Sequence, residues 1–333
     1  MPKIAKIELE QLAQRYLVKA GCLEKVAKLV AQSMVQAEFE GNTVCGLFYL
    51  PVFKEQLSLG KVDGKARPKI LKNHGGSILI DAANGFAHPA INLATEVVIK
   101  AAQENGIAAA GITRSYNALS LAHHVLPLAA GGMIGICCSN APASVAPPGG
   151  KKPTFGTNPM AFAVPGPSSP ALVVDQSASA VTKTKLLMHN AEHKEIPLGW
   201  AQDDDGQATS DPAAGLAGSL LPFGGQKGAN IGLIVEILSA VLTGANLSAH
   251  AASFSGHDIG RPGVGQFLIA IDPARFAGES FLETLEKLRQ QYEDSDLRFP
   301  GKKFRIHRDD ANEPMITVDE ALWKYLSVET GCD

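Results

Sequence analysis

The sequence predicts a mixed α/β protein that lacks a Rossmann nucleotide-binding motif. Apolar runs of β-forming residues at 77–81, 108–113 and 133–138 alternate with helical stretches, which is the order of an α/β layer. No Gly-x-Gly-x-x-Gly pattern follows a predicted strand, so an ordinary Rossmann domain is disfavoured. A glycine-rich turn with a lysine, residues 222–228, stands instead before a strongly apolar helical stretch.

Composition and charge narrow the class of protein. Of the 333 residues, 45% are apolar and 19% are charged, which excludes general disorder and suffices for one large domain or two ordinary ones. The net charge of −3 gives no electrostatic footprint for nucleic acid or an anionic membrane. No apolar run reaches the roughly 18 residues of a membrane span, and the N-terminus lacks the apolar core of a signal peptide. Five mostly scattered cysteines indicate reduced thiols in the cytoplasm, and no zinc spacing is present, so no metal is expected.

The elements follow from apolar periodicity and from breakers. The first 60 residues have helical spacing, with a break at Gly21 and a third short helix beyond Gly46. The stretch 140–170 is rich in proline and glycine and is expected to be a long connection that holds only short strands. Strands are expected at 77–81, 108–113, 133–138, 160–164, 171–175 and 266–272, and helices at about 89–103, 119–129, 179–190, 229–242, 280–292 and 317–328.

The turn at 222–228 has two interpretations. Its glycines allow a tight turn and a close approach of the backbone, and Lys227 stands at the start of the helix. A helix N-terminus carries unpaired N–H groups and a positive dipole end, so the turn is a candidate anion or phosphate site. The simpler interpretation is a solvated lysine before a core helix, since the spacing is not that of a P-loop.

Five motifs in one order resemble the malate/L-lactate dehydrogenase family, the one with the sulfolactate-dehydrogenase-like fold. They span 155–162, 174–179, 199–203, 220–228 and 298–301, so the resemblance covers nearly the whole chain. This family is unrelated to the Rossmann lactate and malate dehydrogenases. The Pro-Phe-Gly-Gly-x-Lys-Gly form and Asn84-Gly85-Phe86-Ala87 look closest to the Δ1-piperideine-2-carboxylate/Δ1-pyrroline-2-carboxylate reductases.

The resemblance implies an organisation, a cofactor and a set of partners. An N-terminal helical segment at 1–72 is expected to form one lobe with C-terminal helices, a central NAD(P)-binding and catalytic part spans 73–260, and residues 261–333 return to the first lobe. The family uses NADPH or NADH and forms homodimers. A small-molecule substrate is therefore expected, with no nucleic acid or membrane partner.

The family's site residues map onto matching positions of this chain. Asp203 matches a carboxylate beside the proton donor, while Thr157, Ala178 and Ser179 match positions that face the substrate. Cofactor contacts map to Asn117, Ala118, Leu119, Ser120, Leu121, Asp175, Gln176, Ser177, Gln226, Lys227, Arg298, Pro300, Gly301, Lys302 and Lys303. Taken singly, Thr157, Ser179 and Asp203 could also be ordinary polar residues of turns. As part of the ordered set of motifs, they favour a functional interpretation.

The chain departs from the family at its proton-donating pair. The family has Ser-His and, a few residues on, an arginine that grips the substrate carboxylate; the matching residues here are Val44, Cys45 and Tyr49. Valine cannot relay a proton, and tyrosine cannot form the bidentate charged clamp of arginine. Cys45 is either a proton donor or a small hydrophobe in the place of the imidazole. Tyr49 either hydrogen-bonds the substrate or packs as an aromatic residue.

These observations predict a reductase of a cyclic 2-imino acid, because such an imine arrives protonated and needs little help from an enzyme acid. The alternatives are a 2-hydroxy-acid dehydrogenase, in which the developing alkoxide needs a proton donor, and a catalytically impaired paralogue that binds the cofactor.

Overall fold

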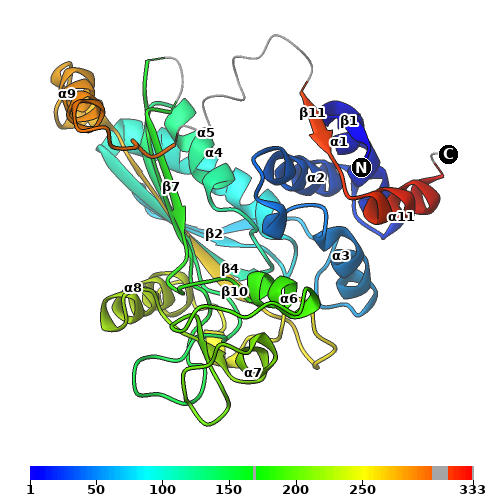
Figure 1. Ribbon diagram of the computed structural model, residues 1–333. Coiled ribbons are helices and arrows are strands. Elements are labelled where there is room, and N and C mark those ends of the chain that lie inside the picture. Colours follow the sequence, from blue (N-terminus) through cyan, green and yellow to red (C-terminus); the bar gives the residue numbers. More distant parts are fainter. Residues whose placement is uncertain (168–169, 302–313, 332–333) are drawn as a thin grey trace.

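The computed structural model describes residues 1–167, 170–301 and 314–331, and a seven-stranded mixed sheet forms its centre (Figure 1). Within this sheet β3 and β4 are parallel, and all other neighbouring strands are antiparallel. The predicted mixed α/β fold is confirmed, and it is not a Rossmann fold. In spatial order the strands are β2 (Lys69–Asn73), β3 (Ser77–Asp81), β4 (Ile107–Ser115), β10 (Val264–Ile271), β5 (Ile134–Ser139), β6 (Met160–Val164) and β7 (Leu172–Gln176).

Helices cover both faces of the sheet. On one face, α4 (Ala87–Asn105) and α5 (Ala122–Ala130) bury the largest apolar cluster, to which Cys137 belongs. The side chain of the next residue, Cys138, points to the other face, where it accepts a hydrogen bond from Ser239 at 3.4 Å. Ser239 lies in the π-helical η2 (Ile237–Val241), which continues α8 (Gln226–Glu236).

The N-terminal helices form a separate lobe that the C-terminal part of the chain completes. Its helices are α1 (Lys6–Lys19), α2 (Glu24–Phe39) and α3 (Tyr49–Ser58). Strand β11 (Met315–Thr317) pairs with β1 (Lys3–Ala5), and α11 (Glu320–Thr330) packs on α1, where the Tyr16 and Tyr325 hydroxyls lie 2.9 Å apart. In Figure 1 the blue and red elements accordingly lie side by side. Strand β10, although it lies beyond residue 260, stays in the centre of the main sheet.

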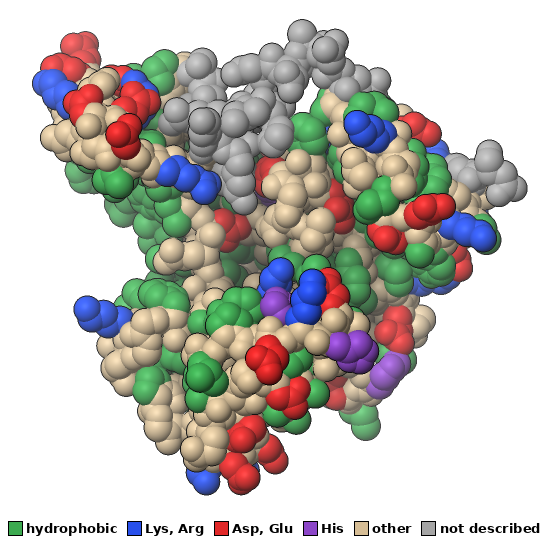
Figure 2. All heavy atoms as spheres, in the orientation of Figure 1, with side chains coloured by type: hydrophobic (Ala, Val, Ile, Leu, Met, Phe, Trp, Pro, Cys, Tyr) green, Lys and Arg blue, Asp and Glu red, His purple; other side chains and the backbone are tan. Residues whose placement is uncertain are grey.

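Side chains from the middle of the chain form a third, smaller apolar cluster. It lies among α6 (Lys183–Ala191), α7 (Pro212–Ala217), β8 (Ala201–Gln202) and β9 (Ser219–Leu220). The amphipathic α9 (Ser280–Asp294) buries none of its residues, and Figure 2 shows acidic and basic side chains crowded on its surface. No helix in the described part of the chain is both long and apolar enough to cross a membrane. The remaining short turns are η1 (Thr43–Cys45), η3 (Ser248–His250) and η4 (Pro273–Arg275).

Candidate active site

A cavity of about 770 Å³ lies where the helical lobe, the sheet and the α6 segment meet. Its walls come from η1 and the start of α3, from loops after β4 and β5, from the end of β7, from the start of α6 and from the segment after η3. The predicted site residues among its lining are Cys45, Tyr49, Asn117, Ala118, Leu119, Ser120, Leu121, Thr157, Asp175, Gln176 and Ser177.

A buried carboxylate, that of Glu38, stabilises the turn that carries Val44 and Cys45. Oε1 of Glu38 accepts a hydrogen bond from the backbone N–H of Leu47 at 2.8 Å. Burial raises the pKa of Glu38, although the bond from Leu47 opposes the rise. A Cβ at Gly46 would lie 2.2 Å from the same Oε1, so any other residue at this position would displace the Glu38 carboxylate. The turn therefore presents Val44 and half-buried Cys45 to the cavity.

Tyr49 links three walls of the cavity. It stands at the start of α3, and polar groups of Thr184 and Asn117 lie near enough to its hydroxyl to act on its pKa. Burial raises the pKa of Tyr49 despite the effect of these groups, so the side chain stays a neutral phenol at neutral pH. This position therefore offers a hydrogen-bond donor without a positive charge.

The predicted cofactor loop after β4 is ordered by its own polar groups. Asn117 accepts a hydrogen bond from the N–H of Leu119 at 2.9 Å, and Leu119 adopts left-handed backbone geometry with φ of 57°. Oδ2 of Asp175 accepts from the Ser120 hydroxyl at 2.8 Å and from the N–H of Ala122 at 3.0 Å. The structure thus brings the first two predicted cofactor segments together, with the Asp175 carboxylate at the end of β7 facing the N-terminal end of α5.

A buried histidine, His124, stabilises this loop by a hydrogen bond to its backbone. Nε2 of His124 lies 2.9 Å from the carbonyl oxygen of Ala118, which fixes it as the donor. Burial lowers the pKa of His124 to about 4, so the ring is neutral. His88 stacks edge-on against it at 5.1 Å between ring centroids. Both rings are buried structural groups rather than cavity-lining residues.

The three predicted substrate-facing residues divide into two groups. Thr157 lines the cavity. Ala178 and Ser179 are buried outside the lining: the N–H of Ala178 donates to the Thr157 carbonyl at 2.8 Å, and the Ser179 hydroxyl donates to the Val181 carbonyl at 2.7 Å. In this conformation the hydroxyl of Ser179 is therefore engaged in the protein's own turn.

Several predicted cofactor residues lie outside the cavity lining. Gln226 begins α8 and donates to exposed Asn230 at 2.9 Å, with Lys227 beside it. Gly301 adopts φ of 101° against β7, where a Cβ would lie 2.7 Å from the N atom of Val173. Arg298 and Pro300 precede it and do not line the cavity either, and Lys302 and Lys303 lie outside the described residues.

Asp203 also lies outside the cavity lining. Its Oδ1 accepts hydrogen bonds from the N–H groups of Asp205 at 3.0 Å and Gln207 at 2.8 Å, the arrangement of a turn-forming aspartate. Its catalytic role stays a prediction.

Polar groups that no sequence motif marks also lie at the cavity. Lys183 is the one basic side chain among the described lining residues, and Thr182 and Thr184 flank it at the start of α6. The tyrosine at position 49, where the resemblance leads one to expect an arginine, is the sequence signal to expect that another cation holds the substrate carboxylate. Behind the wall, the buried carboxylate of Glu236, which does not line the cavity itself, accepts from Asn158 Nδ2 at 2.9 Å and from the N–H of the lining residue Ser248 at 2.7 Å.

Comparison with known proteins gives consistent matches over the whole chain. The sequence profile of the family described as malate/L-lactate dehydrogenase matches residues 4–327. The chain is 38% identical to the (2R)-3-sulfolactate dehydrogenase (NADP(+)) of Chromohalobacter salexigens, over 94% of this chain and 95% of that protein. It is 36% identical to the Delta(1)-pyrroline-2-carboxylate/Delta(1)-piperideine-2-carboxylate reductase of Pseudomonas putida, over 94% and 92%. The crystal structure of delta1-piperideine-2-carboxylate reductase from Pseudomonas syringae pv. tomato superposes with a TM-score of 0.91 at 33% identity, covering 99% of this chain and all of that one.

Proposed function

The chain belongs to the malate/L-lactate dehydrogenase family and is an NAD(P)-dependent oxidoreductase, and from this premise we propose that it reduces a small cyclic 2-imino acid. The proposed substrates are Δ1-pyrroline-2-carboxylate and Δ1-piperideine-2-carboxylate, with L-proline and L-pipecolate as products. One observation carries the choice: Val44 and Cys45 line the cavity where the resemblance leads one to expect a proton-relaying pair.

Proton balance favours the imine. A cyclic imine that carries a proton on nitrogen becomes a neutral secondary amine when a hydride adds to its C2 atom, and no further proton is needed. A 2-keto acid develops an alkoxide at the same step and needs a donor close to its oxygen. Val44 has no proton to give, and the thiol of Cys45 is a weaker acid than an imidazolium. The cavity therefore suits a substrate that brings its own proton.

The residues of the cavity fit a nicotinamide cofactor. Its volume lies in the range of about 300–1,000 Å³ that ligand pockets occupy. Thr157 and Gln176 line it with a side-chain hydroxyl and a side-chain amide, groups of the kind that a ribose and a carboxamide bind. When bound, the reduced nicotinamide supplies the hydride. We propose NADP as the cofactor, with NAD as the alternative; the related sulfolactate dehydrogenase is named for NADP(+).

The proposed cofactor contacts fall into two sets. Residues 117–121 and 175–177 would hold the part inside the cavity. Gln226, Lys227 and Arg298 would meet the more distant phosphate and adenosine parts, since they lie outside the lining.

The substrate carboxylate needs a cation, and Lys183 is the candidate that the fold provides. It lines the same cavity as Tyr49, and Thr184, which follows Lys183, is one of the polar groups near the Tyr49 hydroxyl. We assign the carboxylate to Lys183, with the Tyr49 hydroxyl as a neutral second donor.

Two alternatives remain as outcomes of the test. A 2-hydroxy-acid dehydrogenase is supported by the 38% identity to a sulfolactate dehydrogenase. A cofactor-binding paralogue without reductase activity is supported by the valine at position 44.

The deciding experiment follows the oxidation of NADPH and NADH in the presence of each substrate. We expect turnover with Δ1-pyrroline-2-carboxylate or Δ1-piperideine-2-carboxylate to exceed that with pyruvate, oxaloacetate or sulfopyruvate by at least tenfold. Faster turnover of the keto acids would support the dehydrogenase instead. Cofactor binding in calorimetry with no turnover of any substrate would support the inactive paralogue.

We also propose that the protein is a cytoplasmic homodimer that pairs through α8 and η2. Leu233, Ile237 and Val241 repeat at steps of four residues, and each is about half exposed or more. Ile234 and Leu242 widen this apolar face, which is larger than scattered surface hydrophobics require. A two-fold axis would bury the same face on both copies. The four described cysteines are free thiols, which supports a reducing compartment.

A further inference from the structure

One wall of the cavity is a segment that we call the strap, residues 253–258. Its Phe254 lines the cavity, and the Phe254 ring packs on Tyr116 with 5.2 Å between centroids. The Tyr116 hydroxyl donates a hydrogen bond to the carbonyl oxygen of Phe254. Tyr116 in turn packs on Phe53, which packs on Tyr49 at 5.4 Å. A row of aromatic rings therefore runs from the strap to the start of α3.

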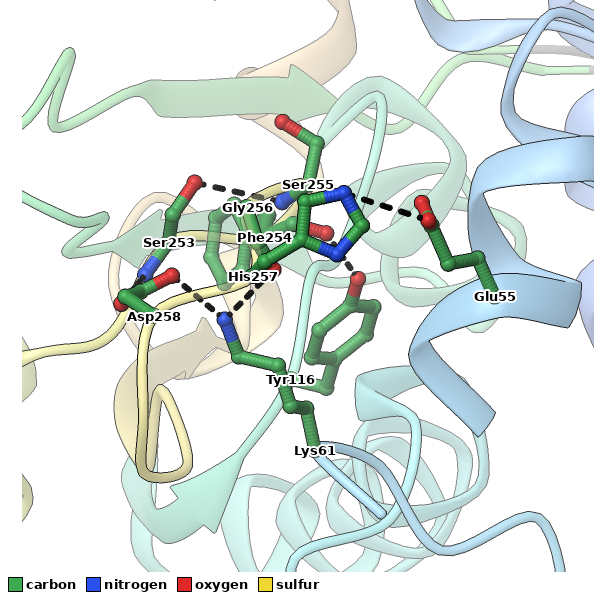
Figure 3. A network of polar contacts seen from close by, with 9 residues as sticks. All are labelled: Glu55, Lys61, Tyr116, Ser253, Phe254, Ser255, Gly256, His257 and Asp258. Carbon is green, nitrogen blue, oxygen red and sulfur yellow. Dashed lines mark hydrogen bonds and ion pairs between the residues drawn. The ribbon is translucent and has the colours of Figure 1, made fainter. Parts of the chain in front are cut away.

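A buried lysine anchors the strap (Figure 3). The ammonium group of Lys61 donates to Oδ1 of Asp258 at 2.6 Å and to the carbonyl oxygen of Gly256 at 3.0 Å. Oδ2 of Asp258 accepts from the N–H of Ser253 at 2.9 Å, which closes the strap on itself. Asp258 thus joins both ends of the strap to Lys61, which lies 197 positions earlier in the chain.

The position of Lys61 makes this anchor specific. Only 4% of its side chain is exposed, and a buried ammonium group is costly unless acceptors surround it. Both acceptors of Lys61 belong to the strap, so the strap in place is the arrangement that satisfies the charge. Partial burial alone would raise the pKa of Asp258, but the hydrogen bonds from Lys61 and Ser253 hold it below its usual value.

We propose that Lys61 is a positioning residue for the substrate pocket, and that Phe254, which it holds in place through the strap, determines the size of substrate that the pocket accepts. The size argument rests on the proposed function, because a five- and a six-membered cyclic imino acid differ by one methylene group. An apolar wall distinguishes such a pair by about 10- to 200-fold in kcat/KM when it fits one of them closely.

The first test replaces Lys61 with methionine, which keeps the stem and removes the charge. We expect Lys61→Met to raise KM for the preferred substrate about tenfold, with a smaller change in kcat, and to speed amide hydrogen exchange of 253–258 but not of β10. Lys54→Met is the matched control: Lys54 pairs with Glu329 at 2.7 Å, away from the strap, so KM and exchange in the strap should be unchanged. If Lys61→Met does not fold, Asp258→Ala removes the same ion pair from its half-exposed side. Unchanged strap exchange in the folded variant would overturn the anchoring role.

The second test measures selection by size. We expect Phe254→Ala to shift the ratio of kcat/KM towards Δ1-piperideine-2-carboxylate over Δ1-pyrroline-2-carboxylate by about tenfold or more, and Phe254→Leu to shift it less. A ratio within twofold of the wild type in both variants would overturn the role of Phe254. Should the wild type reduce only keto acids, the proposed function fails, and the same comparison with pyruvate and 2-oxobutyrate still tests the strap.

Discussion

Lys183 is the residue that we propose for recognition of an acidic substrate in this cavity. The other charged residue of the described lining is Asp175, which is occupied by Ser120 and Ala122 at the start of α5. Among the lining residues that the structure describes, a carboxylate that enters meets one cation, Lys183. The side chain of Lys185, two residues later, does not line the cavity.

Replacement of Lys183 by methionine is expected to raise KM for the imino acid by about tenfold or more, with a smaller effect on kcat. A charge-assisted hydrogen bond contributes about 1.5–3 kcal/mol, and methionine retains most of the stem. Steady-state kinetics of Lys183→Met beside the control Lys185→Met measure the difference. Equal KM values in the two variants would remove Lys183 from the site.

Val44 and Cys45 support a second prediction at the same scale. Because both side chains line the cavity, Val44→Ser with Cys45→His would place a hydroxyl and an imidazole at its wall. A positioned general acid contributes about 10²- to 10⁴-fold, but only where the substrate lacks its own proton. The double variant is therefore expected to gain at least tenfold in the ratio of 2-keto acid to imine kcat/KM. Loss of imine reduction would show instead that Cys45 is a working donor or a shaped wall.

At the scale of the element, α8 shows what the glycine-rich turn provides. Gly224 and Gly225 have φ of 56° and 64°, so the turn needs glycine. A Cβ at Gly228 would lie 2.0 Å from the Phe223 carbonyl oxygen, and one at Gly232 would lie 2.4 Å from the Phe155 ring. The glycines therefore allow close packing of the α8 backbone against Phe223 and Phe155 of the protein itself. A contact between Lys227 and the cofactor would be additional to this packing.

Gly228→Ala is expected to lower the free energy of unfolding by about 1–3 kcal/mol, because the added methyl group overpacks the start of α8. Gly244→Ala serves for comparison: φ is 69° and nothing lies within 4 Å of the added Cβ, so only backbone strain of roughly 1–2 kcal/mol is added. Urea denaturation measures both. A Gly228→Ala variant as stable as the wild type would contradict the packing role.

The same scale shows how far the sequence could predict the fold. Local patterns located most elements: the strands predicted at 77–81 and 160–164 occur as β3 and β6, and the helix predicted at 280–292 occurs as α9. The exposed strand β2 was missed, because its five residues have no buried face and no apolar alternation. The position of β10 between β4 and β5 could not be predicted from the sequence either, because pairing between strands more than 100 residues apart leaves no local pattern.

The sequence could mark candidate site residues where one motif held several of them. Residues 117–121 and 175–177, which the resemblance marks, line one cavity, and their contact with a cofactor stays a prediction. Lys183 and Phe254 reach the same cavity only through tertiary packing. Lone residues such as these carry no signal until the fold brings their neighbours together.

At the scale of the whole molecule, the apolar face of α8 and η2 predicts the assembly. Val241→Glu is expected to give a folded monomer, because a charge on the proposed two-fold interface is buried without a partner in the dimer. Leu288→Glu, on the exposed helix α9, should leave the dimer intact. Light scattering coupled to size-exclusion chromatography measures the mass of each variant. A monomeric wild type, or a dimeric Val241→Glu variant, would falsify the assignment of this face.

The pairing of β1 with β11, and of Tyr16 with Tyr325, sets the order in which the molecule can be completed during synthesis. These two tyrosines are 309 positions apart. At ~5–20 residues per second, α1 emerges from the ribosome roughly 15–60 s before α11. The helix α1, among the first to be made, is thus among the last to be covered by its packing partner. During that interval the surface of α1 that later packs on α11 is exposed to water. Contacts of such long range also slow refolding, so the helical lobe is expected to mature last.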